Sequence, residues 1–397
     1  EFRFAEQQSC YICKCNFTDV HHFYADLCPS CAALNYEKRS AAVDMTGRVC
    51  LVTGARVKVG FQICLKLLRM GARVIATTRF PSDAMRRYKT EPDSSLWLSR
   101  LEVLGLDFRF VGAVERFCAW LSAREAYLDV VINNAAQTIR RPAPYYKHLV
   151  EAERFGHPPM SDGALLYSVT PSMTDSGDTF LPARSLGSCA IARAADSGAN
   201  PLEKAIGGLV FCTSAEASQI VVLPADENEV GFPAGEFDAH GQQLDARSKN
   251  SWKLKLEEVS SEEALEVLLI NVVAPLLLNS RLLPLLRGSP HEHRYVVNVS
   301  AMEGKFNRAK TPFHPHTNMA KAALNMMTRT CAADLARNSN VFMTSVDAGW
   351  INDECPLPEA LARAGRGFQT PLDEIDAAAR VLDPIIAGMR WAATAGE

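Results

Sequence analysis

The sequence predicts an α/β fold in which a doubly wound parallel sheet carries helices on both faces, with a small cysteine-rich module in front of it. Two observations support this prediction. After Gly47, short runs of aliphatic and β-branched residues alternate with stretches of helical length, which is the pattern of repeated βαβ units. Before that point, five of the twelve cysteines fall within the first 31 residues. We therefore divide the chain into a module at 1–46 and an α/β body at 47–397.

The overall composition is that of a globular chain with no strong net charge. Of its 397 residues, 42 are Lys or Arg and 45 are Asp or Glu, so the formal net charge is -3. This balance gives no general attraction to nucleic acid or to an anionic membrane. The longest apolar run, Val267 to Leu278, is shorter than the roughly 20 residues that span a bilayer. Because the chain begins Glu-Phe, a removed targeting peptide would leave no trace, and we expect an intracellular location, either cytoplasmic or in an organelle such as the mitochondrion.

The first element is a pair of cysteine knuckles, CYIC and CPSC, separated by fourteen residues. The knuckles contain four candidate metal ligands: Cys10, Cys13, Cys28 and Cys31. Two close thiolates from each knuckle can occupy the corners of a tetrahedron, so this spacing predicts a structural Zn²⁺ site that leaves no position for a substrate. Disulfide bonds are the alternative, which a reducing compartment disfavours. One of three nearby residues can also replace a ligand: Cys15, His21 or His22.

The α/β body opens with a strand at 48–53 that leads into a glycine-containing turn, TGARVKVG. A turn of this kind before a helix presents free backbone N–H groups to a phosphate. It supplies four candidate cofactor-binding residues: Gly54, Arg56, Lys58 and Gly60. Lys58 stands where a glycine would let the backbone approach a phosphate closely. The lysine therefore either obstructs the phosphate or adds a positive charge to its site.

The second strand, at 73–79, ends in Arg79 and lacks the Asp or Glu that would accept hydrogen bonds from an NAD ribose about 20 residues after the glycines. An arginine suits a 2′-phosphate, so we expect NADP(H) rather than NAD(H). A third strand is expected at 101–107 and a fourth at 128–136, where it ends in NNAA.

A long insertion follows, at about 137–260. Its segment 161–201 is rich in Ser, Ala, Gly and Asp and predicts a loop that is mobile or ordered by a partner. The run GGLVFCTS at 207–214 predicts an additional strand, and 224–243 predicts an acidic loop. The run RRPAPYYKHL at 140–149 either lines a substrate pocket or faces a protein partner. The insertion and the cysteine module are thus the candidate surfaces for protein partners.

The remaining elements continue the alternation. We expect a helix at 261–286, a strand at 294–300, a helix at 318–337, a strand at 341–347 and a last helix that starts near Thr370. In that last helix Thr370 can cap the N-terminus, Pro371 suits the first turn, and Asp373 faces the free amides.

Several motifs occur in an order that resembles the short-chain dehydrogenase/reductase family, whose fold is Rossmann-like. They are the glycine turn, NNAA, Asn271 in a long helix, Ser300 at the end of the fifth strand, Lys321 on the next helix and DAGWI after the sixth strand. The resemblance implies that a dinucleotide lies along the C-terminal ends of the strands. It also implies a small carbonyl or alcohol substrate. Four further residues would line the cofactor cleft: Asp107, Asn133, Ala135 and Ile351.

The sequence departs from the family at one catalytic position, because Thr317 stands four residues before Lys321, where the family has a tyrosine. In the family, that tyrosine gives its proton to the substrate oxygen, the lysine lowers its pKa and the strand-end serine holds the substrate. Asn271, Ser300, Thr317 and Lys321 would therefore form the catalytic frame. A threonine hydroxyl does not titrate near neutral pH, so only His316 or His314 can replace the missing acid.

Two functions stay open at this point. The first is an NADP(H)-binding oxidoreductase with altered or weakened catalysis. The second is a non-catalytic binding or scaffold subunit of a larger assembly, in which the Rossmann body and the zinc module are contact surfaces.

Overall fold

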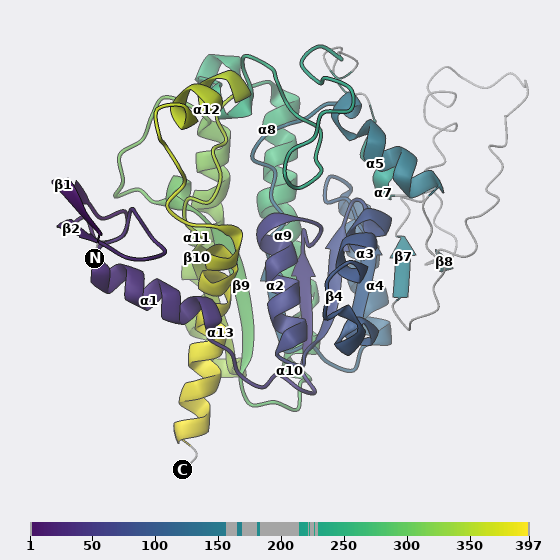
Figure 1. The fold of residues 1–397 in the computed structure, drawn as a ribbon. Helices are drawn as coiled ribbons and strands as arrows, with labels where there is room; N and C mark the ends of the chain where they lie inside the picture. Colours follow the sequence, from purple (N-terminus) through teal and green to yellow (C-terminus); the bar gives the residue numbers. More distant parts are fainter. Residues whose placement is uncertain are drawn as a thin grey trace, which may run out of the picture.

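The computed structural model describes residues 2–155, 165–168, 181–182, 214–220, 222, 226 and 229–395. Its centre is an eight-stranded sheet in the order β10-β9-β6-β3-β4-β5-β7-β8, covered by helices (Figure 1). Neighbouring strands are parallel except β7 and β8. The strands are β3 (Val49–Thr53), β4 (Arg73–Thr78), β5 (Leu101–Gly105), β6 (Val130–Asn133), β7 (Leu165–Ser168), β8 (Leu181–Pro182), β9 (Arg294–Ser300) and β10 (Val341–Asp347). The predicted α/β fold with a doubly wound parallel sheet is confirmed.

The helices form two layers, one on each face of the sheet. On one face lie α2 (Lys58–Arg69), α3 (Pro81–Lys89) and α13 (Glu374–Ala395), and on the other lie α4 (Val111–Arg124), α9 (Ala274–Arg281), α10 (Leu283–Arg287) and α11 (Pro315–Ser339). Alternate residues of a strand point to opposite faces. In β3, Cys50 and Val52 accordingly pack under the first layer, while Val49 and Leu51 pack under the second. A central strand buried on both faces reads as a continuous apolar run, as 48–53 does.

The long helix expected at 261–286 is interrupted. It comprises α8 (Ser261–Leu268), a π-helical turn at Leu269–Val273, and then α9 and α10. The last helix begins later than predicted, at Glu374. The Oδ1 atom of Asp373 accepts hydrogen bonds from the backbone N–H groups of Ile375 and Asp376, both at 2.9 Å. The prediction that Thr370 caps this helix is therefore wrong, because the carboxylate of Asp373 already satisfies its free amides.

The insertion contributes helices and the two strands at one edge of the sheet. It contains α5 (Ala143–Phe155) and α7 (Ser214–Ala217). The prediction of a loop over 161–201 is wrong at β7 and β8, since β7 pairs in parallel with β5 and so satisfies the backbone groups at that edge. The strand predicted at 207–214 falls outside the described residues except for Ser214, which begins α7.

The cysteine module lies against the C-terminal helix. It consists of the antiparallel strands β1 (Phe2–Ser9) and β2 (Asn16–Val20), followed by α1 (Pro29–Ser40). Figure 1 shows α1 beside α13. Three polar contacts join the module to α13 or to the turn before it. These contacts are Tyr24 Oη to Asp376 Oδ1 at 2.5 Å, Arg39 to Asp373 at 2.6 Å and Lys38 to Asp383 at 2.7 Å. The module is therefore attached to the body by buried and charged contacts. One more helix, α12 (Leu357–Ala364), follows β10.

Candidate functional site

A cleft of about 380 Å³ lies at the C-terminal ends of the central strands. Its lining includes eight of the nine predicted cofactor-binding residues: Gly54, Arg56, Lys58, Gly60, Arg79, Asp107, Ala135 and Ile351. The ninth, Asn133, does not line the cleft. Its side-chain amide donates hydrogen bonds to Asn279 Oδ1 at 2.8 Å and to Asn298 Oδ1 at 2.9 Å, so it ties β6 to α9 and β9.

The glycine turn is shaped by two close backbone approaches. Gly54 has a φ of +70°, and an added Cβ there would lie 2.7 Å from Ala135 Cα. At Gly60 an added Cβ would lie 2.2 Å from the carbonyl oxygen of Gly54. Lys58, between them, adopts a φ of +53°, in the left-handed region that favours glycine. The backbone at position 58 thus keeps a glycine conformation although it carries a long cationic side chain.

Arginine and lysine side chains make the cleft electropositive. Arg56 donates to Asp83 and to Gln242, both at 2.9 Å, and Arg79 donates to the Oη of Tyr146 at 2.9 Å. Burial opposes ionisation of the Tyr146 phenol, yet the neighbouring guanidinium groups of Arg79 and Arg141 outweigh it and lower the pKa of that phenol. Asp107, which also lines the cleft, forms an ion pair with Arg109 at 2.9 Å.

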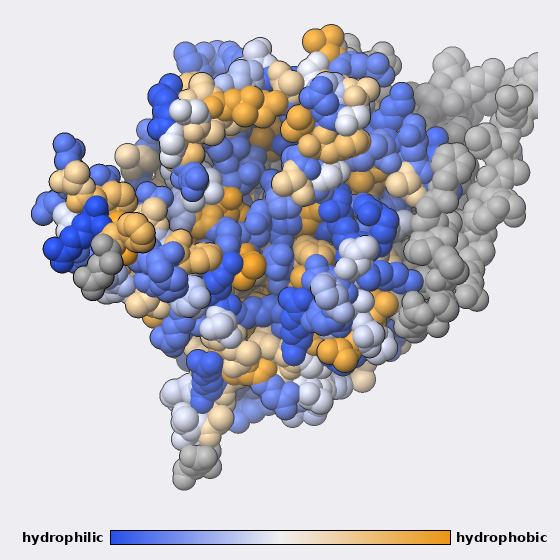
Figure 2. All heavy atoms as spheres, in the orientation of Figure 1, coloured by the Kyte–Doolittle hydropathy of each residue, from blue (hydrophilic) through white to orange (hydrophobic). Residues whose placement is uncertain are grey.

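A second cavity, of about 500 Å³, adjoins the cleft. The two share four lining residues: Thr138, Ile351, Asn352 and Glu354. The second cavity contains Thr317, Lys321 and His314 from α11 and its N-terminus, and Tyr11 from the cysteine module. Trp252, Phe313 and Trp350 make much of its wall aromatic. On the face shown in Figure 2, hydrophobic residues gather along the upper edge, near α12, among hydrophilic ones.

Lys321 and Thr317 reach this cavity from one face of α11, as their spacing predicts. The Nζ of Lys321 donates to the carbonyl oxygen of Val299 at 2.8 Å. Burial lowers the pKa of Lys321 to about 8, and the carboxylates of Glu303 and Asp347 oppose this only in part. Thr317 is 2% exposed, and its hydroxyl has no hydrogen-bond partner among the described residues.

The other residues of the predicted catalytic set do not line the cavity. Ser300 is buried, and its hydroxyl lies 3.5 Å from the carbonyl oxygen of Lys321. Asn271 belongs to the π-helical turn and exchanges two hydrogen bonds with the backbone of Gln137, at 2.7 and 3.0 Å. His316 faces Glu263, with 3.5 Å between Nε2 and Oε1, and does not line the cavity. His314 does line it, and its ring stacks on Trp252 at a centroid distance of 3.8 Å.

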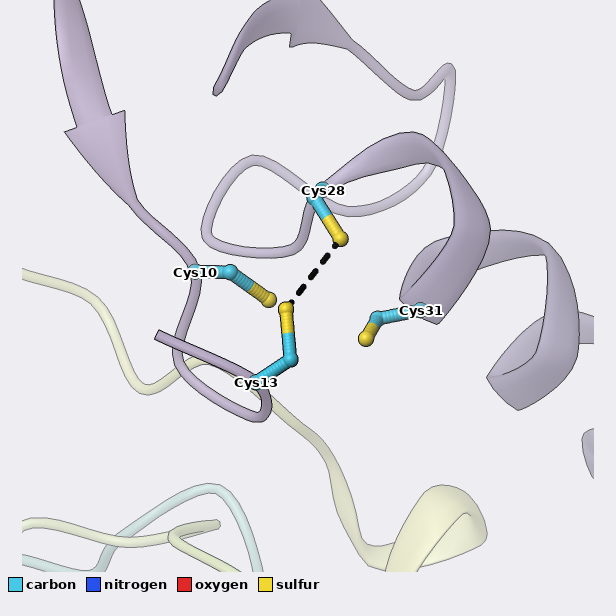
Figure 3. Close-up of side chains that lie close together, drawn as sticks. All are labelled: Cys10, Cys13, Cys28 and Cys31. Carbon is cyan, nitrogen blue, oxygen red and sulfur yellow. Dashed lines mark hydrogen bonds between the residues drawn. The ribbon is translucent and has the colours of Figure 1, made fainter. Parts of the chain in front are cut away.

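The four cysteines of the knuckles converge on one point. Their sulfur atoms all lie within 4.8 Å of one another, and Figure 3 shows all four side chains directed inward. Cys10 and Cys13 lie around the turn after β1, while Cys28 and Cys31 lie at the start of α1. The cluster includes none of the alternative ligands Cys15, His21 and His22. The sulfur atoms of Cys13 and Cys28 are 3.6 Å apart, too far for a disulfide bond of about 2.05 Å.

Sequence reasoning missed two residues of this site. Tyr11 stands between two candidate metal ligands and belongs to no catalytic or cofactor motif. Gln242 belongs to the loop of the insertion and carries no motif. For the run 140–149 the sequence left open either a substrate pocket or a surface that faces a protein partner. Arg141 and Tyr146 from this run line the cleft.

The chain is similar to known proteins along most of its length. It is 32% identical over 387 residues to an uncharacterized protein of Acanthamoeba polyphaga mimivirus, an alignment that covers 95% of this chain and 71% of the viral protein. Residues 48–152, from β3 into α5, match the family model described as short chain dehydrogenase. Over these residues the chain carries the sequence pattern of the short-chain dehydrogenase family. The predicted family resemblance is thereby confirmed.

Further proteins are similar over shorter stretches or at lower identity. A short-chain dehydrogenase/reductase of Armillaria gallica is 33% identical over 103 residues, which cover 25% of this chain and 31% of the fungal protein. A short-chain dehydrogenase of Streptomyces avermitilis superposes with a TM-score of 0.46 at 17% identity, covering 85% of this chain and 82% of that one. An active-site complex of Pseudomonas aeruginosa RhlG with NADP gives 0.47 at 16% identity, covering 85% and 90%. Among the described residues, none of the helices is both long and apolar enough to cross a membrane.

Proposed function

We propose that this chain is an NADP(H)-binding oxidoreductase with a weakened or altered proton relay, acting on a small carbonyl or alcohol compound. The observation that supports this most directly is the electropositive cleft at the C-terminal ends of the strands, which adjoins a cavity containing Lys321. When bound, NADP(H) supplies or accepts a hydride. The chain's own residues would hold it, orient the substrate and exclude water.

The residues of the cleft fit such a dinucleotide. The N-terminus of α2 and the glycine turn suit a pyrophosphate, because free N–H groups and the helix dipole favour anions there. Lys58 lines this part of the cleft and has no ion-pair partner among the described residues. Arg79 follows β4 directly, where an arginine accommodates a 2′-phosphate. Its guanidinium donates one hydrogen bond to the Oη of Tyr146, so it has donors left for a phosphate.

Binding measurements test the choice of cofactor. Calorimetric titration with NADPH and NADH should show that Arg79→Ala weakens NADPH binding by about 1.5–3 kcal/mol, the range for a hydrogen bond to a charged group, and spares NADH. Arg281→Ala is a matched control, because that arginine is exposed and pairs with Glu115 outside the cleft. An equal loss for both cofactors would reject the role of Arg79. If the wild type binds neither cofactor, the oxidoreductase proposal fails.

The second cavity suits a substrate with an apolar body. Its wall contains Trp252, Phe313 and Trp350, and the cations on its rim already have partners. Lys253 pairs with Glu359 at 2.7 Å, and Arg363 pairs with Asp353 at 3.0 Å. A carboxylate substrate at Lys253 or Arg363 would have to compete with these carboxylates, whereas a neutral aromatic or aliphatic ketone would not.

The missing tyrosine limits the rate that this cavity can support. Thr317 offers a hydroxyl that does not titrate near neutral pH, and loss of a positioned general acid typically costs 10²–10⁴-fold in rate. His314 lines the cavity, but burial lowers its pKa and its Nδ1 already contacts the carbonyl oxygen of Trp252 at 2.9 Å. We therefore expect little turnover of simple ketones with NADPH. Robust turnover that survives His314→Ala together with His316→Ala would contradict this reasoning.

The non-catalytic alternative has one specific observation in its favour. The ammonium of Lys321 donates to the carbonyl oxygen of Val299, where it supports the end of β9 and not a bound ligand. In that case the Rossmann body, the cysteine module and the insertion would act as contact surfaces within an assembly. Tight NADPH binding without turnover of any alcohol or ketone in a broad panel would favour this alternative.

The cysteine cluster fits a structural Zn²⁺ ion. With Zn–S bonds of about 2.3 Å, the sulfur atoms of a tetrahedral site lie about 3.8 Å apart. The distance of 3.6 Å between Cys13 and Cys28 is close to this value, and all four sulfur atoms lie within 4.8 Å of one another. Four thiolates close the coordination shell, so the ion would stabilise the module and would not take part in the reaction.

A further inference from the structure

The cysteine module reaches the candidate substrate cavity through one side chain. Tyr11 lies between Cys10 and Cys13, yet its side chain lines the 500 Å³ cavity together with Thr317 and Lys321. Among the described residues, it is the one tyrosine in that lining. A residue of the first knuckle thus belongs to the same cavity as the lysine of α11.

The phenol of Tyr11 also fixes the segment that follows β10. Its Oη accepts a hydrogen bond from the backbone N–H of Trp350 at 2.9 Å. The next residue, Ile351, packs against the apolar cluster of the module, which includes Cys10, Leu27 and Leu372. Ile351 lines both the cofactor cleft and the substrate cavity. The module therefore contacts the chain at the junction of the two cavities.

The backbone of Tyr11 is held within the module itself. Its N–H donates to the carbonyl oxygen of Asp26 at 2.8 Å, and its own carbonyl oxygen accepts from the Nζ of Lys14 at 2.5 Å. The candidate ligands Cys10 and Cys13 lie on either side of it in sequence. The geometry of the cysteine cluster therefore sets where the phenol of Tyr11 can be.

The phenol retains one unused donor. Because Trp350 donates to the oxygen, the O–H group of Tyr11 is available, and it has no acceptor among the described residues. A hydroxyl in this position can donate a hydrogen bond to an oxygen atom of a ligand in the cavity.

We propose that Tyr11 is a positioning residue and a wall of the substrate cavity, and that metal binding by the cysteine module holds Trp350 and Ile351 in place through it. The metal ion would then control the shape of the cavity, although its closed coordination shell leaves no position for a substrate. The role of Tyr11 at a substrate cavity rests on the proposed NADP(H)-binding function. The hydrogen bond between Tyr11 and Trp350 does not depend on that function.

Hydrogen exchange of the zinc-loaded full chain tests the contact directly. In Tyr11→Phe the amide of Trp350 loses its acceptor, so exchange in peptides that span Asp347 to Asn352 should accelerate about two- to twelve-fold, as expected for the loss of one hydrogen bond. Tyr36→Phe is the matched control, because Tyr36 is a half-exposed tyrosine of the same module that does not line the cavity. Removing the metal with a chelator should accelerate exchange in the same peptides by at least as much.

The NADPH affinity of the same variants separates this inference from the proposed function. We expect Tyr11→Phe and chelation both to weaken NADPH binding, and Tyr36→Phe to leave it unchanged. Accelerated exchange in a chain that binds no NADPH would support the positioning role while the cofactor proposal fails. Unchanged exchange at 347–352 in both Tyr11→Phe and the chelated wild type would overturn the inference, whatever the affinity for NADPH.

Discussion

Replacement of Lys58 by glycine should stabilise the protein and weaken NADPH binding at the same time. Lys58 has a φ of +53° at the start of α2, and a left-handed conformation costs a residue with a Cβ about 1–2 kcal/mol. Glycine removes that cost but loses about 0.5–1 kcal/mol more conformational entropy on folding. The difference predicts that Lys58→Gly raises the free energy of unfolding by about 0.75 kcal/mol, the middle of a range of about 0–1.5 kcal/mol.

The effect on the cofactor has a different origin. Lys58 lines the cleft and has no ion-pair partner among the described residues, so its ammonium is available to a phosphate. Loss of a hydrogen bond to a charged group costs about 1.5–3 kcal/mol, which lowers affinity by about tenfold or more. Lys58→Ala provides the comparison, because it removes the charge but retains the Cβ and hence the strained backbone.

Denaturant unfolding and calorimetric titration of the three proteins distinguish the explanations. We expect Lys58→Gly to be more stable than Lys58→Ala, and both variants to bind NADPH more weakly than the wild type does. Tighter binding to Lys58→Gly than to wild type would mean that the lysine obstructs the phosphate site. A Lys58→Gly protein no more stable than Lys58→Ala would refute the argument from backbone strain.

Three further predictions concern the metal, the buried lysine and a helix cap. Elemental analysis of protein purified without chelators should find one Zn²⁺ per chain, lost in Cys10→Ser with Cys28→Ser and retained in Cys15→Ser; native protein without zinc would contradict this assignment. Because burial lowers the pKa of Lys321 to about 8, from about 10.4 in an unfolded chain, the unfolded state binds more protons between these values. The stability of wild type relative to Lys321→Met should therefore rise as the pH increases from 8 to 10, and a flat difference would argue against a neutral buried amine. Asp373→Ala removes both the N-cap and the ion pair with Arg39, so it should lower the free energy of unfolding by at least about 1 kcal/mol, and an unchanged denaturation midpoint would show that both contacts are dispensable.

The parallel strands could be predicted from sequence because their pattern needs no tertiary information. A strand covered by helices on both faces must be apolar throughout, so runs such as RYVVNVS at 294–300 stand out from the surrounding helices. Strand β7 was missed for the opposite reason. Its four residues lie in a segment rich in Ser, Gly and Asp, and pairing with the exposed edge of β5 determines its conformation.

The candidate site likewise contains residues that could be predicted from sequence and residues that could not. Most residues of the cleft could be predicted because they lie near the ends of strands or in the turn after β3, and parallel strands bring these ends together. The choice between His314 and His316 could not. His314 has a φ of +45° before Pro315, and this backbone reversal directs His314 toward Trp252 and the cavity while His316 is buried against Glu263. No residue pattern specifies this left-handed conformation.

The absence of a tyrosine at position 317 therefore does not leave the cavity without a phenol. α11 presents a threonine to the cavity, and the cysteine module presents Tyr11 from a different part of the chain. The two elements differ in what holds them. α11 is held by packing against the sheet. Tyr11 is held by the cysteine cluster, because Cys10 and Cys13 lie on either side of it in the sequence. Any contact that a ligand makes with the Tyr11 hydroxyl should thus depend on the metal, which a tyrosine on α11 would not. Dependence of ligand affinity on zinc, lost in Tyr11→Phe, is the signature that distinguishes this arrangement from a module that only stabilises the fold.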